Sequence, residues 1–374
     1  MIDGRTPSPL AGEGSDGRGA EGATSALAGI TPARSPQPGG LKQRGRRLAA
    51  LLAILLAVLA VASLAIGPAP IAPLTAAQAL VTDLGGASII VREIRLPRTL
   101  LAILIGAAHG VTGAALQGLL RNPLADASVL GAPQAAALGA VLVLYFGLAG
   151  AWSWALPAAA IAGALVSIAV VVAVAGRQAG VVVLVLAGLA VGSLAGAATS
   201  FAISLSPNPF AVTEIVFWLL GSLEDRSSAH LLLAAPFLVP AVALLLSTGS
   251  ALRALTLGED AAASLGVDVA RARFVIVLGS AIAAGASVAV AGAIGFVGLV
   301  SPHLVRPFVS YDPARTLVPS ALAGAALLLA ADCAVRLIPT ATEVKIGVVT
   351  ALLGVPFFLW VIARRRAELV EAPA

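Results

Sequence analysis

Few side chains in this sequence can do acid–base, nucleophilic or metal chemistry, and their spacing forms no familiar catalytic motif. The two lysines, Lys42 and Lys345, lie outside any G-x-x-x-x-G-K-[ST] sequence, so the chain lacks the phosphate-binding loop of the P-loop ATPases. The three histidines are far apart and show no zinc-ligand spacing. The single cysteine, Cys333, excludes an intramolecular disulfide and a cysteine-rich metal site. We therefore predict no catalytic residue, no metal site and no cofactor, and do not expect an enzyme.

Carboxylates inside a membrane are the usual signature of ion-coupled transport. In this chain Asp332 is the one acidic residue within the long apolar segments. An ion-coupled secondary transporter is therefore disfavoured, although it stays open as an alternative. An intramembrane enzyme is a weaker alternative, because no set of catalytic side chains converges.

The composition indicates an integral membrane protein built from helices. Of 374 residues, 59% are hydrophobic and 11% are charged, whereas soluble domains carry about 25% charged residues. The 39 glycines and the 4% of aromatic residues favour closely packed helices over an outer-membrane barrel. We predict an all-α, polytopic fold with about ten transmembrane helices. The apolar segments are 48–66, 97–119, 131–150, 155–175, 181–204, 229–247, 274–294, 296–309, 316–338 and 345–362.

The predicted domains follow these segments. Residues 1–47 hold Pro, Gly, Ser and charges without apolar periodicity, which predicts a disordered cytoplasmic tail. Residues 48–366 form the ten-span domain, and 367–374 a short cytoplasmic C-terminal tail. The eighth segment, 296–309, is too short to cross alone, so we predict a tilted or broken helix.

The arginines and lysines orient the chain. With ten spans both termini share one side, and 17 of the 23 Lys and Arg residues fall on it, as the positive-inside rule requires for the cytoplasm. The other six face the opposite side, and three of them, Arg92, Arg95 and Arg98, form a cluster that goes against that rule.

Two apolar segments carry glycines at four-residue spacing, which places them on one helix face. One set is Gly106, Gly110, Ala114 and Gly118, and the other is Gly188, Gly192, Gly196 and Ser200, so each set includes one other small residue. Such a face allows another backbone to approach closely. Tight packing in a bundle is the simpler interpretation, and a helix that lines the transport pathway is the alternative.

Four further motifs occur in order along the chain. The first runs from Arg95-Leu-Pro-Arg98 to Arg121-Asn-Pro-Leu-Ala125. The second is the polar, alanine-rich loop 257–267, where Gly266 predicts a helix stop. The third is Gly292-Ala-Ile-Gly-Phe-Val-Gly-Leu-Val-Ser-Pro-His-Leu-Val-Arg306, and the fourth is Gly347-Val-Val-Thr-Ala-Leu-Leu-Gly-Val-Pro-Phe-Phe-Leu-Trp360.

Together these motifs closely resemble the FecCD-type permeases, the membrane subunits of ABC importers for ferric siderophores, haem and cobalamin. The resemblance covers about residues 48–366. It implies a pair of permease subunits in the bacterial inner membrane, either a homodimer or two different paired permeases, and we expect the homodimer. Two ATPase subunits that use ATP and Mg would bind below the pair, and a periplasmic substrate-binding protein would dock above it.

The resemblance also implies roles for individual residues. The ATPase-coupling segment matches Leu257, Gly258, Glu259, Asp260, Ala262, Leu265 and Gly266. The cytoplasmic gate matches Asn122, Pro123 and Leu124. The arginines that grip the binding protein match Arg95, Arg98 and Arg336. Residues assigned to the pathway or to helix packing are Gly188, Gly192, Gly196, Gly347 and Gly354.

Simpler roles stay open for several of these residues. Arg95 and Arg98 are alternatively lipid-headgroup anchors, and Asn122-Pro123 a helix stop. Asp332 and Arg336 stand four apart on one helix face, where a local ion pair is possible. The chain departs from the family at Glu343-Val-Lys-Ile346, where Leu-Pro is usual.

We therefore expect a permease subunit without catalytic activity, driven by a separate ATPase. Its expected substrate is a ferric siderophore, with cobalamin and haem as the other candidates.

Overall fold

The computed structural model describes residues 38–152, 154–176, 180–340 and 342–370. Contacts divide the chain into two units, Met1–Lys42 and Gln43–Ala374, and the helical bundle is the second unit. The elements are α2 (Pro38–Ala65), α3 (Pro73–Ala79), α4 (Gly86–Ile89), the π-helical turn η1 (Ile90–Arg95), α5 (Leu96–Leu119), the 3₁₀ turn η2 (Ala127–Leu130), α6 (Ala132–Tyr145), α7 (Leu148–Ala151), α8 (Ala155–Ala175), α9 (Val181–Ser204), α10 (Pro209–Leu219), α11 (Ser228–Leu246), α12 (Gly249–Leu255), α13 (Glu259–Ser264), α14 (Val269–Ala291), α15 (Val297–Val305), the 3₁₀ turn η3 (Arg306–Val309), α16 (Pro313–Leu337) and α17 (Ile346–Val370).

The predicted all-helical membrane fold is confirmed. Each of the ten apolar segments corresponds to a helix, and α8 and α9 have the predicted bounds. Among the described residues, eight helices are long and apolar enough to cross a membrane, and α6 and α10 are shorter apolar helices. Helix α10, which lies between the fifth and sixth spans, was not predicted from the sequence.

Helix ends differ from the predicted domain boundaries. The first helix begins at Pro38 rather than at residue 48, and α17 continues to Val370, into the predicted C-terminal tail. Residues 1–37 and 371–374 of the two predicted tails lie outside the described residues. The eighth segment is short: α15 has nine residues and follows an irregular stretch, 292–296. Phe296 adopts a left-handed conformation (φ 65°) directly before α15, which interrupts helical geometry there.

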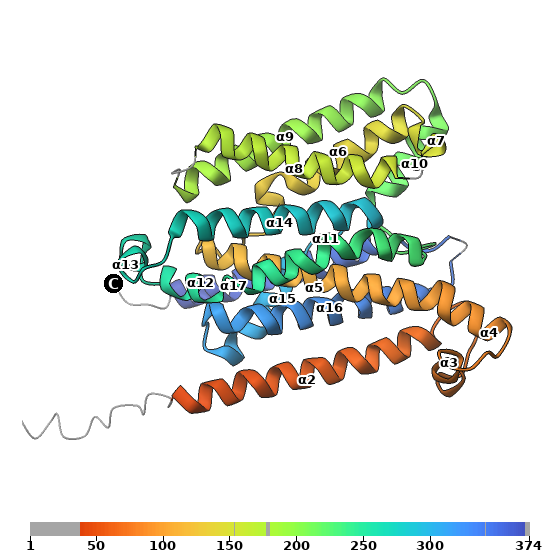
Figure 1. Cartoon of the computed structure of the whole chain (residues 1–374), viewed down its shortest axis with the longest axis horizontal. Coiled ribbons are helices and arrows are strands. Elements are labelled where there is room, and N and C mark those ends of the chain that lie inside the picture. The colour runs from red at the N-terminus through yellow and green to blue at the C-terminus, as the bar shows by residue number, and fades with distance from the viewer. Residues whose placement is uncertain (1–37, 153, 177–179, 341, 371–374) are drawn as a thin grey trace, which may run out of the picture. The chain divides into compact units, whose positions relative to one another are not determined.

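The two ends of the bundle carry different short elements (Figure 1). One end, here named the α13 end, holds α12, α13 and the C-terminal part of α17. The opposite end, named the α3 end, holds α3, α4, α7 and α10. The long helices run between these ends, so residues far apart in the sequence meet at each of them.

Helix α5 forms the centre of the bundle, because it packs against α11, α14, α15 and α16. Its glycine face is the reason it can approach α16 so closely. A β-carbon at Gly106 would lie 2.4 Å from the carbonyl oxygen of Gly324, and one at Gly324 would lie 2.3 Å from that of Gly106. A β-carbon at Gly110 would lie 2.0 Å from the carbonyl oxygen of Ser320. Backbone therefore contacts backbone, as in small-residue membrane interfaces.

We expect Gly110→Ala to lower the amount of folded protein, because the new methyl group would overlap the Ser320 carbonyl. Overpacking of this kind costs about 1–3 kcal/mol. Gly196→Ala in α9 is the matched control, since a β-carbon there meets nothing within 4 Å. The measurement is the monodisperse yield and the unfolding temperature in detergent. Equal losses for the two variants would contradict the assigned packing of α5.

Candidate transport site

The predicted coupling segment forms a short helix at the α13 end (Figure 1). Gly258 precedes α13 with φ 113°, a backbone conformation that side-chain-bearing residues rarely adopt. Gly266 follows the helix with φ 83°, and the amide of Val267 donates to the carbonyl of Ala262 at 3.0 Å. This is the glycine-terminated helix end that the sequence predicted.

The two faces of α13 differ in their exposure to solvent. Ala262 is fully buried and belongs to the main apolar core. Leu257 and Leu265, which flank the helix, are 67% and 65% exposed. Glu259 and Asp260 in its first turn are also exposed. The surface open to a partner protein therefore combines two leucines with two carboxylates, whereas Ala262 faces the subunit's own interior.

The predicted gate residues form a turn between α5 and η2 at the same end. The side-chain oxygen of Asn122 accepts a hydrogen bond from the amide of Leu124 at 2.9 Å. The Nε2 atom of His303 in α15 donates to the carbonyl of Pro123 at 2.9 Å. The guanidinium of Arg121 donates to the carbonyl of Leu255, the last residue of α12. The turn is thereby joined to α15 and to the helix before α13, while Leu124 remains 42% exposed.

The five glycines assigned to the pathway or to packing differ in their surroundings. Gly188 and Gly192 lie against the backbone of residues 129–131, and Gly347 against the carbonyls of Leu220 and Ala293. A β-carbon at Gly354 would overlap the ring of Phe296. Gly196 has open space beside it. The contacts of four of these glycines therefore fit helix packing, and Gly196 remains the best candidate for an open pathway face.

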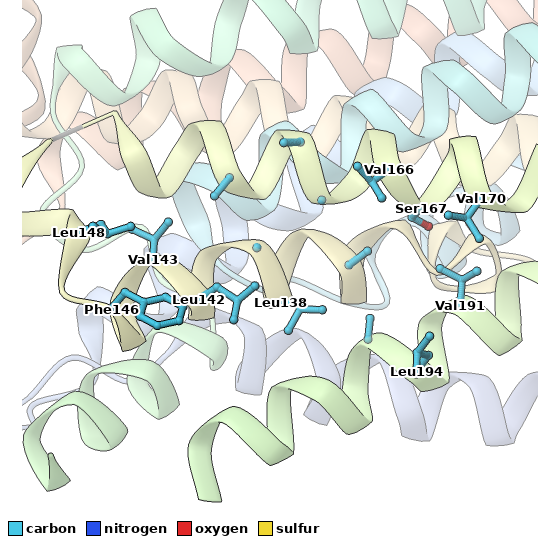
Figure 2. Close-up of a pocket in the computed structure, with 16 residues that line it drawn as sticks. Leu138, Leu142, Val143, Phe146, Leu148, Val166, Ser167, Val170, Val191 and Leu194 are labelled. Carbon is cyan, nitrogen blue, oxygen red and sulfur yellow. The ribbon is translucent and has the colours of Figure 1, made fainter. Parts of the chain in front are cut away.

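A large apolar groove of about 470 Å³ lies between α6, α8 and α9 (Figure 2). Leu138, Leu142, Val166 and Leu194 line it, and its one polar lining residue is Ser167. The Ser167 hydroxyl donates to the carbonyl of Leu130 at 3.3 Å. None of the residues predicted for the coupling segment, the gate, docking or the pathway lines this groove, so it is not part of the candidate transport site.

Arg95, predicted to face a docking partner, lies inside the protein at the α3 end, with 4% of its surface exposed. Its Nη1 atom donates to the carbonyls of Leu64 and Ala65, each at 2.8 Å. These carbonyls end α2, where no further helical turn supplies amide donors. A cation at this end also complements the helix dipole. Arg95 thus holds the end of the first helix to the start of α5.

Arg98 and Arg336, also predicted to dock, belong to a buried network of four charges. Asp332, fully buried, lies 2.8 Å from Nη2 of Arg98 and 2.8 Å from Nη2 of Arg336. Nη1 of Arg98 also donates to Glu343 at 2.9 Å. Arg336 reaches further, to the carbonyl of Ser63 in α2 at 2.9 Å. The local Asp332–Arg336 ion pair considered from the sequence is present, and Arg98 extends it to α5.

These contacts give the three arginines partners inside this chain, whereas the docking prediction requires their side chains to contact another protein. A side chain that grips another protein must reach the surface, whereas their guanidinium groups bind carboxylates and carbonyls of this chain. Two carboxylates neutralise Arg98 and Arg336, and Arg95 binds backbone carbonyls. Their role in docking stays a prediction, and the contacts favour an internal structural role.

Apart from the Asp332–Arg336 pair, the partners of these charges were not predicted from the sequence. Glu343 pairs with Arg98, and Lys345 pairs with Glu224 at 2.7 Å. Their pairing depends on the fold, because Arg98 and Glu343 are 245 positions apart. Among the described residues, no three His, Cys, Asp or Glu side chains gather as metal ligands.

The described residues form a polytopic helical membrane bundle with a short exposed helix at one end. The model of the FecCD transport family matches residues 55–364. The chain therefore belongs to the FecCD family of ABC importer permeases, in which ATP hydrolysis belongs to a separate subunit.

Curated relatives agree with this assignment. The chain is 40% identical over 281 residues to an uncharacterized ABC transporter permease protein, YvrB, of Bacillus subtilis, covering 74% of this chain and 79% of that protein. It is 39% identical to the cobalamin import system permease protein BtuC of Halobacterium salinarum (75% of each chain). It is also 39% identical to the hemin transport system permease protein HmuU of Yersinia pestis (74% and 84%).

A solved structure has the same fold. It is described as an inward-facing conformation of a metal-chelate type ABC transporter, and it superimposes with a TM-score of 0.77 at 29% identity. The match covers 85% of this chain and 99% of that one.

We expect Asp332→Asn to destabilise the protein by about 3–5 kcal/mol, because it leaves two buried guanidinium groups with too little negative charge. Arg253→Gln is the control. It breaks the ion pair between Asp312 and the Arg253 side chain, which is 55% exposed. Loss of this exposed pair should lower the free energy of unfolding by no more than about 1 kcal/mol. Thermal unfolding in detergent measures both. An unchanged unfolding temperature for Asp332→Asn would show that the network is dispensable.

Proposed function

We propose that this protein is the membrane permease of an ABC importer for a bulky metal chelate, driven by ATPase subunits that bind at the α13 end. A ferric siderophore is the first candidate substrate, followed by cobalamin and haem. Two relatives support this class, because their names specify cobalamin and hemin transport. The proposed complex contains two permease copies, two ATPase subunits using ATP and Mg, and a periplasmic binding protein.

The observation that carries the proposal is the exposed surface of α13. A leucine exposed to 65% at the polar end of a membrane bundle is unfavourable in water, which supports a partner protein as its cover. The carboxylate of Asp260 would add charge recognition, while that of Glu259 pairs with Arg273 of this chain. The proposed orientation therefore places the α13 end, and both termini, in the cytoplasm of a bacterial inner membrane.

The contacts of the gate turn support a mechanism of energy coupling. A push on α13 would be transmitted to α12, whose last carbonyl holds Arg121. Arg121 stands next to Asn122-Pro123-Leu124, so a displacement of α12 would move the turn that carries Leu124. In two copies related by symmetry, the exposed Leu124 side chains would close the pathway. ATP binding in the partner thereby opens or closes a route that needs no catalytic group in this chain.

The substrate route is proposed to run along the apolar faces of α17 and its neighbours in two copies. Leu352 and Trp360 on α17 are 69% and 56% exposed in the single subunit. An apolar pocket of about 530 Å³ lies between the start of α17 and residues 219–220 of the chain. Such walls would let a large chelate pass without tight binding, so selectivity would belong to the binding protein.

We expect Leu265→Glu to abolish stable association with the ATPase, because a carboxylate would enter the apolar contact. Leu337→Glu is the matched control, since Leu337 is 66% exposed but ends α16 at the opposite end. Affinity purification of the tagged permease with its co-expressed ATPase measures the association. Equal recovery of the ATPase with both variants would contradict the coupling role of α13. Ala262→Arg is less suitable, because Ala262 is fully buried and its replacement would disturb folding.

Reconstitution tests the whole function. Proteoliposomes containing the permease and its ATPase, supplied with the binding protein, should accumulate one of three probes when ATP is available to the ATPase: a ferric hydroxamate siderophore, cyanocobalamin or haemin. Uptake driven by a proton or sodium gradient in vesicles without the ATPase would overturn the proposal in favour of a secondary transporter.

A further inference from the structure

A second pocket, of about 360 Å³, lies where α8, α9 and α14 meet at the α13 end. This volume falls within the range of ligand sites, about 300–1,000 Å³. Its floor is apolar, because Leu184 and Val277 are buried and Val172 completes the wall. Phe274, which is half exposed, stands with Arg271 at the mouth. The pocket is therefore apolar inside and cationic at its opening.

Two arginines line this pocket, and its described lining includes no carboxylate. Arg273 pairs with Glu259 of α13 at 2.7 Å. Arg271 is exposed, and no carboxylate in the described part of the chain forms an ion pair with its guanidinium. The Asp268 carboxylate caps α14 by accepting the amide of Arg271 at 2.9 Å. These four charges cancel in sum, so the attraction for an anion comes from the position of the Arg271 guanidinium beside the apolar cavity.

We propose that this pocket binds an anionic phospholipid, with its phosphate on Arg271 and an acyl chain against Val172, Leu184 and Phe274. All three walls are ends of helices long and apolar enough to cross a membrane, which would place the pocket near the headgroups with its apolar part toward the lipid chains. A basic pocket between spans on the cytoplasmic side is a recognised arrangement for anionic headgroups. The groove between α6, α8 and α9 has no charge in its lining, and nothing there would select such a lipid.

The bound lipid also acts on α13. Arg273 lines the pocket and holds Glu259, the first residue of α13. A phosphate beside Arg271 and an acyl chain against Phe274 would restrict the segment of α14 that carries Arg273. The bound lipid thereby reduces the local opening of α13. This consequence for transport rests on the proposed function, whereas lipid binding itself does not.

Native mass spectrometry of the detergent-solubilised full chain tests the binding. Phosphatidylglycerol should bind more tightly than phosphatidylcholine. Arg271→Gln should weaken phosphatidylglycerol binding about five-fold, as expected for one cation near a lipid surface, and leave phosphatidylcholine unchanged. Arg253→Gln removes an arginine at the same end that already pairs with Asp312, and should keep the preference of the parent.

Three results would overturn the proposal. They are equal affinity for the two lipids, an equal loss in both arginine variants, and displacement of phosphatidylglycerol by millimolar inorganic phosphate, which would indicate a simple anion site. Hydrogen exchange adds a readout of the effect on α13. Phosphatidylglycerol should slow amide exchange in residues 259–267 of the parent but not of Arg271→Gln. Because neither measurement includes an ATPase or substrate, failure here is distinguishable from failure of the proposed function.

Discussion

The close backbone approach of α5 to its neighbours is the constraint on which the rest of this structure depends. In lipid, helices gain little from burying apolar surface against one another, so close packing has to supply the attraction. Gly106, Gly110 and Gly324 allow it, because a side chain at any of them would overlap a carbonyl of the facing helix. Because α5 runs through the centre of the bundle, the buried charge network lies at its start and the gate turn lies at its end.

At the α3 end, the start of α5 organises buried charge. Isolated charges are costly at membrane depth, and they persist where partners neutralise them. Arg98, Asp332, Arg336 and Glu343 satisfy this condition together. Arg336 also binds the carbonyl of Ser63 in α2. That contact matters because the apolar part of α2 is only 11% buried, so polar contacts at its end attach it to the bundle.

At the α13 end, the end of α5 leads into the gate turn, and the contacts there link three motifs that are separate in the sequence. Arg121 binds the last carbonyl of α12, and His303 binds the carbonyl of Pro123. Glu259 of α13 pairs with Arg273, which lines the proposed lipid pocket. A partner that moves α13 would therefore act on the gate and the lipid site through a few defined hydrogen bonds and ion pairs.

The sequence by itself determined the membrane class, the all-helical fold, the positions of the ten apolar helices and the glycine stop after α13. These features depend on local composition and periodicity, which a short stretch of chain already contains. Only the tertiary structure decided which way the polar residues face. The family resemblance implied a surface role for Arg95 and Arg98, yet their partners are at Leu64 and at Asp332 and Glu343, distant in the sequence. Likewise, only packing shows that Ala262 faces inward while Leu265 faces outward, because a six-residue helix is too short for its pattern to define a face.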